Sequence, residues 1–552
     1  MQQIKDSISE IVNELFNIDE QIELTRTDEQ FGDYATNIAL RLSKKVGQNP
    51  REIAQAIIGG LKSDLIETAE VAGPGFINLS LRDEALLQLV SDEPHKALQG
   101  KEVVAEYSDP NPFKVLHAGH LYTSIVGDAI ANLLENAGAT VHRVNFGGDV
   151  GLHVAKAMWG MIQALEGENP EKLTQISPSD RANWMAQCYQ EGSSAYDDEE
   201  AAHSAITELN SKVYDIHTRD DHESPLAQIY WTCRTWSYDY FNEFYARIGT
   251  KFEKYYPESE TAPLGLSTVK EHTGDVYEES DGAIVFKGEA HGLHTRVFIN
   301  KNGLPTYEAK DVGLALKKWQ DYHFDKSVII TGNDIIEYMK VVMKSLEVFL
   351  PEATARTTHL THGQVKMAGG VKMSSRKGNF LRAVDVLDAA AEANKLANDG
   401  QESQQVSLGA VKYAFLKQRI GGDTVYDPAE SVSMQGNSGP YLQYAHARAT
   451  SILAKSQLDQ VVNLPKLQPG ERSLLRKLSE YHEVVESATT ELMPHHICTY
   501  LYELAQVFNR FYEHNHVIGD EREASRIKLV SIYAKTLQNG LTLLGISTPE
   551  KM

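Results

Sequence analysis

The chain has 552 residues, of which 42% are hydrophobic and 23% are charged, and its formal net charge at pH 7 is −23. This length exceeds what one hydrophobic core usually supports, so about two to four domains are expected. The acidic charge argues against a protein that coats nucleic acid indiscriminately. No apolar run approaches the roughly 18–20 residues that are needed to cross a bilayer.

The three cysteines, Cys188, Cys233 and Cys498, lie far apart and form no CxxC pair. This spacing argues against a disulfide framework and against a structural zinc site, and it favours a reducing compartment. The first residues mix acidic with apolar side chains and lack a signal-peptide core. We therefore expect a cytoplasmic protein without a membrane partner.

Residues 1–98 predict a small α+β domain. Helices are expected over residues 4–16, around residues 35–42 and from Pro50, and one strand is expected over residues 71–81. A linker with Pro94 follows over residues 91–100. Physical chemistry alone favours a stabilising cap for this domain.

Residues 101–149 predict a strand, a helix and a second strand. Apolar residues alternate over residues 103–107, Pro110 and Pro112 then interrupt the strand, and a helical pattern runs from Leu116 to Gly138. The second strand is expected over residues 140–146. Parallel sheets bind ligands at the carboxyl ends of their strands, so the loop between strand and helix is a candidate site.

This loop contains His117, Gly119 and His120 at the predicted start of the helix. Two histidines three residues apart at a helix N-terminus can face one anion, with unpaired backbone N–H groups behind them. Gly119 allows a phosphate or a flat ring to approach the backbone. A histidine pair that only caps the helix, or half of a metal site, is the alternative.

Polar helical sequence over about residues 155–275 predicts an insertion into the sheet, and its aromatic-rich helix over residues 231–245 is expected to be core. A strand from Tyr277 is expected to restart the main sheet. Tyr307 and Asp311 are four residues apart and share one face of a predicted helix. A strand over residues 327–331 ends at a candidate ligand-binding turn: Gly332, Asn333 and Asp334.

A later segment, Lys372-Met373-Ser374-Ser375-Arg376-Lys377-Gly378, is rich in cations and hydroxyls and is flanked by glycines. Such a loop can close over a triphosphate and neutralise charge on a leaving pyrophosphate. A solvated turn is the alternative for the segment alone. From residue 396 onward, apolar residues recur at three- and four-residue spacing, which predicts a helical bundle.

The order of the two segments, HxGH early and KMSSRKG late, resembles the HIGH and KMSKS signatures of class I aminoacyl-tRNA synthetases. The residues EYSDPN and KxLHxGH around the first signature resemble arginyl-tRNA synthetases in particular. The segments FGDYATNIAL, VAGPGFINL, GNSGPYLQYAHAR and NGLTLLGI also resemble that family. The resemblance implies an α/β fold: a Rossmann-like parallel-sheet catalytic domain (99–395), an additional N-terminal α+β domain at the tRNA elbow (1–98) and a C-terminal α-helical anticodon-binding bundle (396–552).

The resemblance further implies ATP-dependent attachment of L-arginine to tRNA(Arg) through an arginyl-adenylate, with activation that requires tRNA and Mg²⁺ that enters with ATP. No DNA partner and no dedicated protein metal ligand are expected, and the family favours monomers. The implied catalytic residues are Lys114, His117, His120, Lys372 and Lys377. The implied ATP-binding residues are His117, Gly119, His120, Gly332, Asn333, Asp334, Lys372, Met373, Ser374 and Ser375.

The implied arginine-binding residues are Glu106, Asn111, Glu258, Tyr307 and Asp311. The carboxylates of Glu258 and Asp311 match the planar guanidinium fork, with Tyr307 beside them, and Glu106 and Asn111 are expected to hold the α-ammonium and backbone end of arginine. The implied tRNA-binding residues are Tyr441, Gln443, Tyr444 and Arg448. In KMSSRKG the second lysine stands two positions later than in KMSKS, so which cation replaces the usual one stays open. Two alternatives also stay open: a nucleotidyl transferase or ligase related to pantothenate synthetase, and a non-catalytic RNA-binding paralogue.

Overall fold

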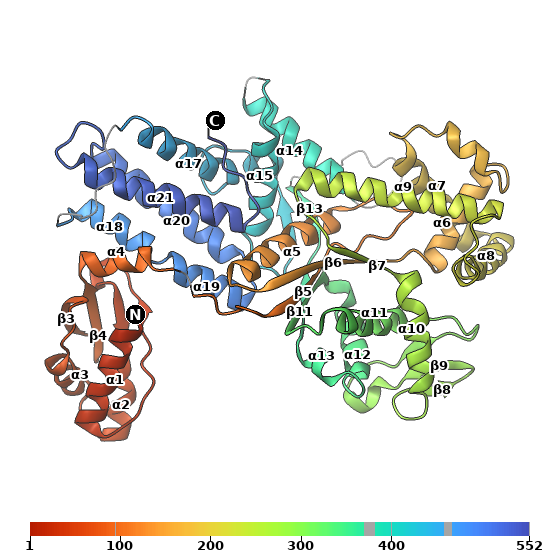
Figure 1. Ribbon diagram of the computed structural model, residues 1–552. Coiled ribbons are helices and arrows are strands. Elements are labelled where there is room, and N and C mark those ends of the chain that lie inside the picture. Colours follow the sequence, from red (N-terminus) through yellow and green to blue (C-terminus); the bar gives the residue numbers. More distant parts are fainter. Residues whose placement is uncertain (94, 369–380, 399, 457–465, 551–552) are drawn as a thin grey trace.

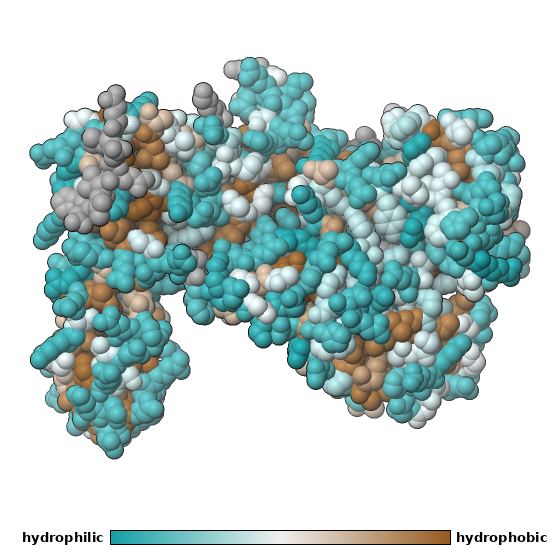
Figure 2. Space-filling view, in the orientation of Figure 1, coloured by the Kyte–Doolittle hydropathy of each residue, from teal (hydrophilic) through white to brown (hydrophobic). Residues whose placement is uncertain are grey.

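A computed structural model describes residues 1–93, 95–368, 381–398, 400–456 and 466–550. A small N-terminal domain, a central α/β domain with a helical extension, and a helical bundle follow one another along the chain (Figure 1). Hydrophilic residues cover most of the face shown in Figure 2. Within the described ranges, the helices are all too short or too polar to pass through a bilayer.

The N-terminal domain packs three helices, α1 (Gln2–Phe16), α2 (Ile38–Val46) and α3 (Pro50–Gly60), with a four-stranded antiparallel sheet. The strand order is β1 (Thr25–Arg26), β2 (Tyr34–Thr36), β4 (Phe76–Leu81) and β3 (Ile66–Ala72). The prediction of a single strand over residues 71–81 is wrong. Gly73 and Gly75 adopt positive φ angles of 51° and 141° and reverse the chain between β3 and β4.

The central sheet is parallel throughout. Its order is β12 (Thr357–His362), β11 (Lys326–Gly332), β5 (Glu102–Glu106), β6 (Thr140–Gly147) and β7 (Lys254–Pro257). Helix α5 (Ala118–Asn136) connects β5 to β6, which confirms the predicted strand–helix–strand unit. Val103 and Ala105 face α5, whereas Val104 faces the opposite core, so β5 is buried on both sides.

The helical extension between β6 and β7 has its own hydrophobic core. It comprises α6 (Leu152–Ala164), η2 (Pro170–Gln175), α7 (Arg181–Asp198), α8 (Glu200–Thr218) and α9 (Pro225–Ile248). Helices α6 and α7 cross closely: a Cβ atom on Gly160 would lie 2.1 Å from the Cys188 carbonyl oxygen. Because β7 lies in the main sheet, the insertion ends before Lys254, and the predicted boundary near residue 275 is wrong.

The strand that was expected to restart the main sheet instead joins a separate antiparallel sheet. This small sheet comprises β8 (Glu278–Ser280), β9 (Ala283–Phe286) and β10 (Arg296–Ile299), followed along the chain by α11 (Tyr307–Tyr322). The turn η3 (Gly288–His291) connects β9 to β10. The strands of these short hairpins form their hydrogen bonds with one another. A pattern of alternating residues predicts a strand but does not tell whether that strand pairs within a hairpin or with β11.

Two glycines allow α10 (Glu258–Glu271) to lie against α11. A Cβ atom on Gly265 would stand 1.8 Å from the Ala309 carbonyl oxygen, and one on Gly313 would stand 2.1 Å from that of Thr261. Beyond α11 come β11, η4 (Asn333–Ile335), α12 (Ile336–Leu346), α13 (Pro351–Ala355) and β12. The close contact keeps the N-terminal halves of α10 and α11 beside each other at the carboxyl edge of the sheet.

The C-terminal region is mainly a helical bundle, as predicted. Its helices are α14 (Ala383–Ala397), α15 (Gln404–Leu416), α16 (Pro428–Ser431), α17 (Gly439–Leu453), α18 (Pro469–Leu478), α19 (Tyr481–Glu491), α20 (His495–His514) and α21 (Glu523–Leu543). Strand β14 (Thr424–Tyr426) lies between α15 and α16 and pairs in parallel with β13 (Val365–Met367), which precedes α14 in the chain. Helices α14 and α15 pack against α5, and α4 (Asp83–Ser91) packs against α18 (Figure 1).

Candidate active site at the carboxyl edge of the parallel sheet

The two signature histidines begin helix α5. The His117 Nδ1 atom accepts a hydrogen bond from the Gly119 backbone N–H at 3.1 Å, and the His120 Nδ1 atom accepts one from the His117 N–H at 3.1 Å. The two rings stack with centroids 3.8 Å apart. Because both Nδ1 atoms accept, each neutral ring carries its proton on Nε2, where it can be donated to a ligand.

Both histidines are uncharged at neutral pH. Burial, together with the nearby His362 and Lys114, lowers the pKa of His117 to about 4. Burial also holds the pKa of His120 well below its usual range. The pair therefore provides neutral hydrogen-bond donors. Gly119 has a steric reason as well, because a Cβ atom there would lie 2.8 Å from the His117 Cε1 atom.

His362 is a third histidine in this site, and it was not predicted. It ends β12, is buried, and contacts the Tyr122 ring with centroids 4.6 Å apart. Its Nδ1 atom lies 2.6 Å from the Gly363 carbonyl oxygen. The sequence offers one clue, a His-Gly pair at the end of a β-branched strand, where ligands of parallel sheets bind.

Lys114 supplies a cation beside the histidines. Its Nζ atom lies 4.2 Å from the centre of the Tyr189 ring on α7, so the helical extension helps to position it. Its charge contributes to the lowered pKa values of His117 and His120. The predicted catalytic cation therefore lies at the same edge of the sheet as the signature histidines.

The loop after β5 has a strained backbone. Ser108, Asp109 and Phe113 have φ angles of 76°, 48° and 66°, in the left-handed region that side chains other than glycine rarely adopt. Buried hydrogen bonds hold it: the Ser108 and Tyr245 hydroxyls are 2.8 Å apart, and the Asp109 carboxylate accepts from the Phe146 N–H at 2.8 Å. This over-determined loop fixes the residues that lead to the histidines.

Asn111 lies in the same loop, and its Oδ1 atom accepts a hydrogen bond from the Gly148 N–H at 2.8 Å. Gly148 in turn offers its carbonyl oxygen to His153 Nε2 at 2.7 Å. Since Nε2 of His153 donates, its Nδ1 atom accepts, and the Tyr307 hydroxyl lies 3.3 Å from it. Two of the predicted arginine-binding residues, Asn111 and Tyr307, are thus connected through one chain of hydrogen bonds.

Two predicted carboxylates are paired with buried lysines. Glu258 Oε2 accepts from Lys310 Nζ at 2.5 Å, and Glu106 Oε2 accepts from Lys318 Nζ. The four side chains are 3–4% exposed. Burial raises the pKa of Glu258 although Lys310 opposes this effect. Neither lysine was predicted, because lysines on α11 carry no sequence mark that distinguishes them from solvated ones.

Asp311 is held by a neutral partner instead. Its Oδ2 atom accepts a hydrogen bond from the Tyr338 hydroxyl on α12. Burial, together with the negative charges of Glu106 and Glu258, raises the pKa of Asp311 to about 7 against the lowering effect of this hydrogen bond. A guanidinium placed beside Asp311 would meet an acidic surrounding whose negative charge is not fully balanced.

Gly332, Asn333 and Asp334 lie at the carboxyl end of β11, as expected from the sequence. Asn333 and Asp334 are exposed and form the short turn η4. A Cβ atom on Gly332 would lie 2.5 Å from the Asp334 Oδ1 atom, so this turn requires glycine or a moved aspartate. The negative charge of Asp334 acts on His117, which places the turn near the first signature.

The predicted residues of the second signature, Lys372, Met373, Ser374, Ser375 and Lys377, lie outside the described residues. The chain that follows them returns to the first signature. The Ala118 N–H donates to the Leu381 carbonyl oxygen at 2.7 Å, and the Ala383 N–H donates to that of Leu116 at 2.9 Å. Backbone pairing therefore holds residues 381–383 beside the histidine loop.

The predicted tRNA-binding residues lie on α17. Gln443 is fully buried, and its Nε2 atom donates to the Ser547 carbonyl oxygen at 2.8 Å, so its prediction as a tRNA contact is wrong. Tyr444 is 43% exposed. The Arg448 guanidinium lies 4.5 Å from the centre of the Tyr512 ring, and the Tyr441 hydroxyl accepts from Asn509 at 2.8 Å.

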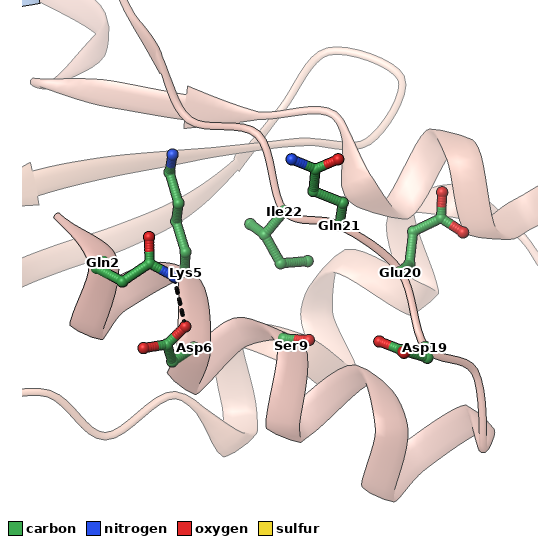
Figure 3. A pocket seen from close by; sticks show the side chains of 8 residues that line it. All are labelled: Gln2, Lys5, Asp6, Ser9, Asp19, Glu20, Gln21 and Ile22. Carbon is green, nitrogen blue, oxygen red and sulfur yellow. Dashed lines mark hydrogen bonds between the residues drawn. The ribbon is translucent and has the colours of Figure 1, made fainter. Parts of the chain in front are cut away.

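A separate cavity of about 370 Å³ lies on the N-terminal domain, between α1 and the segment that follows it (Figure 3). Its lining includes Lys5, Asp6 and Glu20. The Glu20 carboxylate already pairs with Arg41 and Lys45. This cavity contains neither signature, so it is not the candidate active site.

Comparisons with known proteins agree with this geometry. Three family models match: "Arginyl tRNA synthetase N terminal domain" over residues 2–81, "tRNA synthetases class I (R), catalytic domain" over residues 83–427 and "DALR anticodon binding domain" over residues 442–552. An arginine–tRNA ligase from Crocosphaera subtropica is 32% identical, and the alignment covers 100% of this chain and 98% of the relative. One from Haemophilus influenzae is 32% identical, with 95% and 94% covered.

Solved structures show the same fold. Thermus thermophilus arginyl-tRNA synthetase is 23% identical, with a TM-score of 0.80 and 100% of both chains covered. The Plasmodium falciparum arginyl-tRNA synthetase is 22% identical, with a TM-score of 0.80 and coverage of 100% of this chain and 99% of the other. The match of the catalytic-domain model to more than half of the residues, together with the relatives of 32% identity, shows that the chain belongs to the class I arginyl-tRNA synthetases.

Proposed function

We propose that this chain uses ATP to attach L-arginine to tRNA(Arg) through an arginyl-adenylate. One observation carries the proposal: the neutral histidine pair at the start of α5 shares the carboxyl edge of the sheet with a cluster of acidic side chains around Asp311. The first element suits phosphate oxygens, and the second suits a guanidinium. Membership of the arginyl-tRNA synthetase family supports the same substrates.

In the first step, an arginine carboxylate oxygen attacks the α-phosphorus of ATP, and the bond to pyrophosphate breaks. His117 and His120 donate their Nε2 protons to α-phosphate oxygens as charge develops there. Lys114 supplies positive charge, and Lys372 and Lys377 are proposed to hold the departing pyrophosphate together with Met373, Ser374 and Ser375. In the second step, a terminal tRNA hydroxyl attacks the carbonyl carbon of the mixed anhydride, and AMP leaves. Positioning and charge stabilisation suffice for this chemistry.

Arginine is recognised by side chains on several elements. Asp311 receives the guanidinium, with Tyr307 beside it. Lys310 donates to the Oε2 atom of Glu258, and the Oε1 atom of the same carboxylate contributes to the guanidinium site. Glu106 and Asn111 hold the α-ammonium and the backbone end. When another amino acid enters such a site, the buried carboxylates are left without hydrogen-bond donors. The site therefore discriminates against other amino acids by a factor of about 10⁴.

Adenosine is proposed to bind between Gly119 and the turn of Gly332, Asn333 and Asp334, at the carboxyl ends of β5 and β11. Mg²⁺ enters with ATP, coordinated by its phosphates. The described part of the chain contains no group of three or more His, Cys, Asp or Glu side chains suited to a metal ion.

The proposed domains divide the reaction between them. Residues 1–98 hold the tRNA elbow, residues 99–395 catalyse both steps, and residues 396–552 bind the anticodon with Tyr441, Tyr444 and Arg448. Arginine activation requires bound tRNA, and the enzyme acts as a cytoplasmic monomer. The buried, unpaired thiols of Cys188, Cys233 and Cys498 support a reducing compartment.

Arginine-dependent exchange of pyrophosphate into ATP, measured with and without tRNA(Arg), tests the proposal. We expect exchange with arginine and tRNA together, and charging of tRNA in the same mixture. Lysine in place of arginine is the control, because an ammonium cannot form the guanidinium fork. Pyrophosphate exchange whose rate is the same with and without tRNA, and without any charged tRNA as product, would indicate a ligase for small molecules. Binding of tRNA without exchange would indicate a non-catalytic paralogue.

A further inference from the structure

Asp311 and the two neighbouring glutamates are held in different ways. Lysines engage Glu106 and Glu258, whereas the partner described for the Asp311 carboxylate is a phenol. Tyr338 comes from α12, the helix after β11, so this hydrogen bond crosses between two helices. A neutral donor orients a carboxylate without cancelling the charge that a cationic substrate needs.

The surroundings oppose the ionisation of Asp311 from several sides. Glu106 on β5 and Glu258 on α10 act on Asp311 with negative charge, and Lys318 on its own helix acts with positive charge. The charge of Asp311 in turn helps burial to raise the pKa of Asp109, in the loop after β5. Acids of like charge favour the protonated form of Asp311. The hydrogen bond from α12 is the contact that favours the carboxylate without adding a charge.

The Tyr338 ring, whose hydroxyl donates this hydrogen bond, is itself held in place. The Arg296 guanidinium lies 5.4 Å from the centre of the Tyr338 ring, and Arg296 also pairs with Glu308 at 3.1 Å. Burial raises the pKa of Tyr338 well above its usual range, and the charge of Asp311 raises it further. The phenol therefore keeps its proton and acts as a donor.

We propose that Tyr338 is a positioning residue for arginine: its hydroxyl holds Asp311 as an oriented carboxylate whose Oδ1 atom faces the substrate guanidinium. The inference rests on the proposed function, because Asp311 acts there as the guanidinium acceptor. Tyr338 itself touches no reacting atom. Its effect on catalysis therefore passes through Asp311 and concerns arginine but not ATP.

The variant Tyr338→Phe removes only the hydroxyl and keeps the ring against Arg296. We expect the arginine KM for tRNA charging at pH 7 to rise about tenfold, as for a lost hydrogen bond to a charged group, while the ATP KM stays within about twofold. The acid limb of kcat/KM for arginine should shift to higher pH, because the pKa of Asp311 rises. Raising the pH should therefore restore part of the lost arginine affinity.

Tyr277→Phe is the matched control. Its buried hydroxyl also contacts α12, where it lies 3.1 Å from that of Ser345, but Asp311 is not its partner. We expect this variant to leave the arginine KM and the acid limb unchanged. An equal shift of the arginine KM in both variants would show a general disturbance of α12 and overturn the proposal.

A double variant tests whether Tyr338 acts through Asp311. In the Asp311→Asn background, Tyr338→Phe should change the arginine KM by less than about twofold, because the charge that it positions is gone. If the increases in the arginine KM of the two single variants multiply in the double variant, the inference is overturned. An unaltered arginine KM and acid limb in Tyr338→Phe alone would also overturn it. Those results leave arginine-dependent charging by the unmutated enzyme intact. Absence of that charging would refute the proposed function instead.

Discussion

Replacing Asp311 by asparagine tests the centre of the arginine pocket. Asparagine keeps the shape, and its Oδ1 atom can still accept from Tyr338, but its Nδ2 atom presents donors to the donors of a guanidinium. A charge-assisted hydrogen bond is worth about 1.5–3 kcal/mol. We therefore expect the arginine KM at pH 8 to rise about 10- to 100-fold, with the ATP KM within about twofold.

The pH profile gives the same residue a second readout. With a pKa of about 7, Asp311 is about one-tenth ionised at pH 6 and about nine-tenths ionised at pH 8. Between these values, kcat/KM for arginine should rise about tenfold in the unmutated enzyme. In Asp311→Asn this rise should disappear, because asparagine does not titrate. The profile is measured from initial rates of tRNA charging at saturating ATP.

Stability should change in the opposite direction to activity. The pKa of Asp311 is about 7 in the folded chain and about 3.9 when unfolded, so the folded state binds more protons between these pH values. The contribution of this group to the free energy of unfolding therefore falls as pH rises from about 4 to 7. Above pH 7 the loss of stability that is caused by ionising the buried carboxyl group has reached its full size. Asp311→Asn should stabilise the ligand-free enzyme, more at pH 8 than at pH 5, in denaturant titrations.

Glu260→Gln provides the control for a general change of charge. Glu260 lies on the neighbouring helix α10, is 42% exposed and pairs with Lys317 at 3.7 Å. Its replacement should leave the arginine KM and the pH profile unchanged. An unaltered arginine KM in folded Asp311→Asn, or an acid limb that persists there, would refute the role of Asp311 in the pocket.

Three further substitutions test other parts of the molecule. His120→Ala should slow adenylate formation by about 10²–10³-fold with a smaller change in arginine affinity, measured in single-turnover experiments; an unchanged rate would remove the histidine from phosphate binding. Arg448→Ala should weaken tRNA binding and reduce its salt slope by about one, while an unaltered slope would place Arg448 away from tRNA phosphates. Asp33 is fully buried and pairs with Arg472 and Arg476 at 2.8 and 3.2 Å, so Asp33→Asn should cost about 3 kcal/mol in denaturant titrations; a neutral effect would show that this ion pair does not hold the N-terminal domain.

Sequence alone was sufficient for features that depend on neighbouring residues. The strand–helix–strand unit, the position of His117 and His120 at a helix N-terminus, and the C-terminal bundle follow from periodicity, proline and glycine placement and capping. These effects act over a few residues, so a local pattern records them. The same patterns failed where pairing is ambiguous, as in the hairpin of β3 with β4.

Burial on α17 could not be read from its sequence. Gln443 lies beside Tyr444 in the chain, yet the first is buried against the C-terminal segment and the second is exposed. A polar residue on a helix is usually exposed, and it is buried only where the fold supplies a hydrogen-bond partner for its side chain. That partner, the Ser547 carbonyl oxygen, is 104 residues away.

The chemistry of the arginine pocket was likewise decided by tertiary structure. Sequence spacing placed Tyr307 and Asp311 on one helix face, but the partners that set the charge of the pocket come from distant segments. Lys310 reaches Glu258 across 52 residues, and Lys318 reaches Glu106 across 212. Because a buried carboxylate takes its charge and orientation from whichever groups the fold brings within hydrogen-bonding distance, only the folded chain determines which carboxylate remains for arginine.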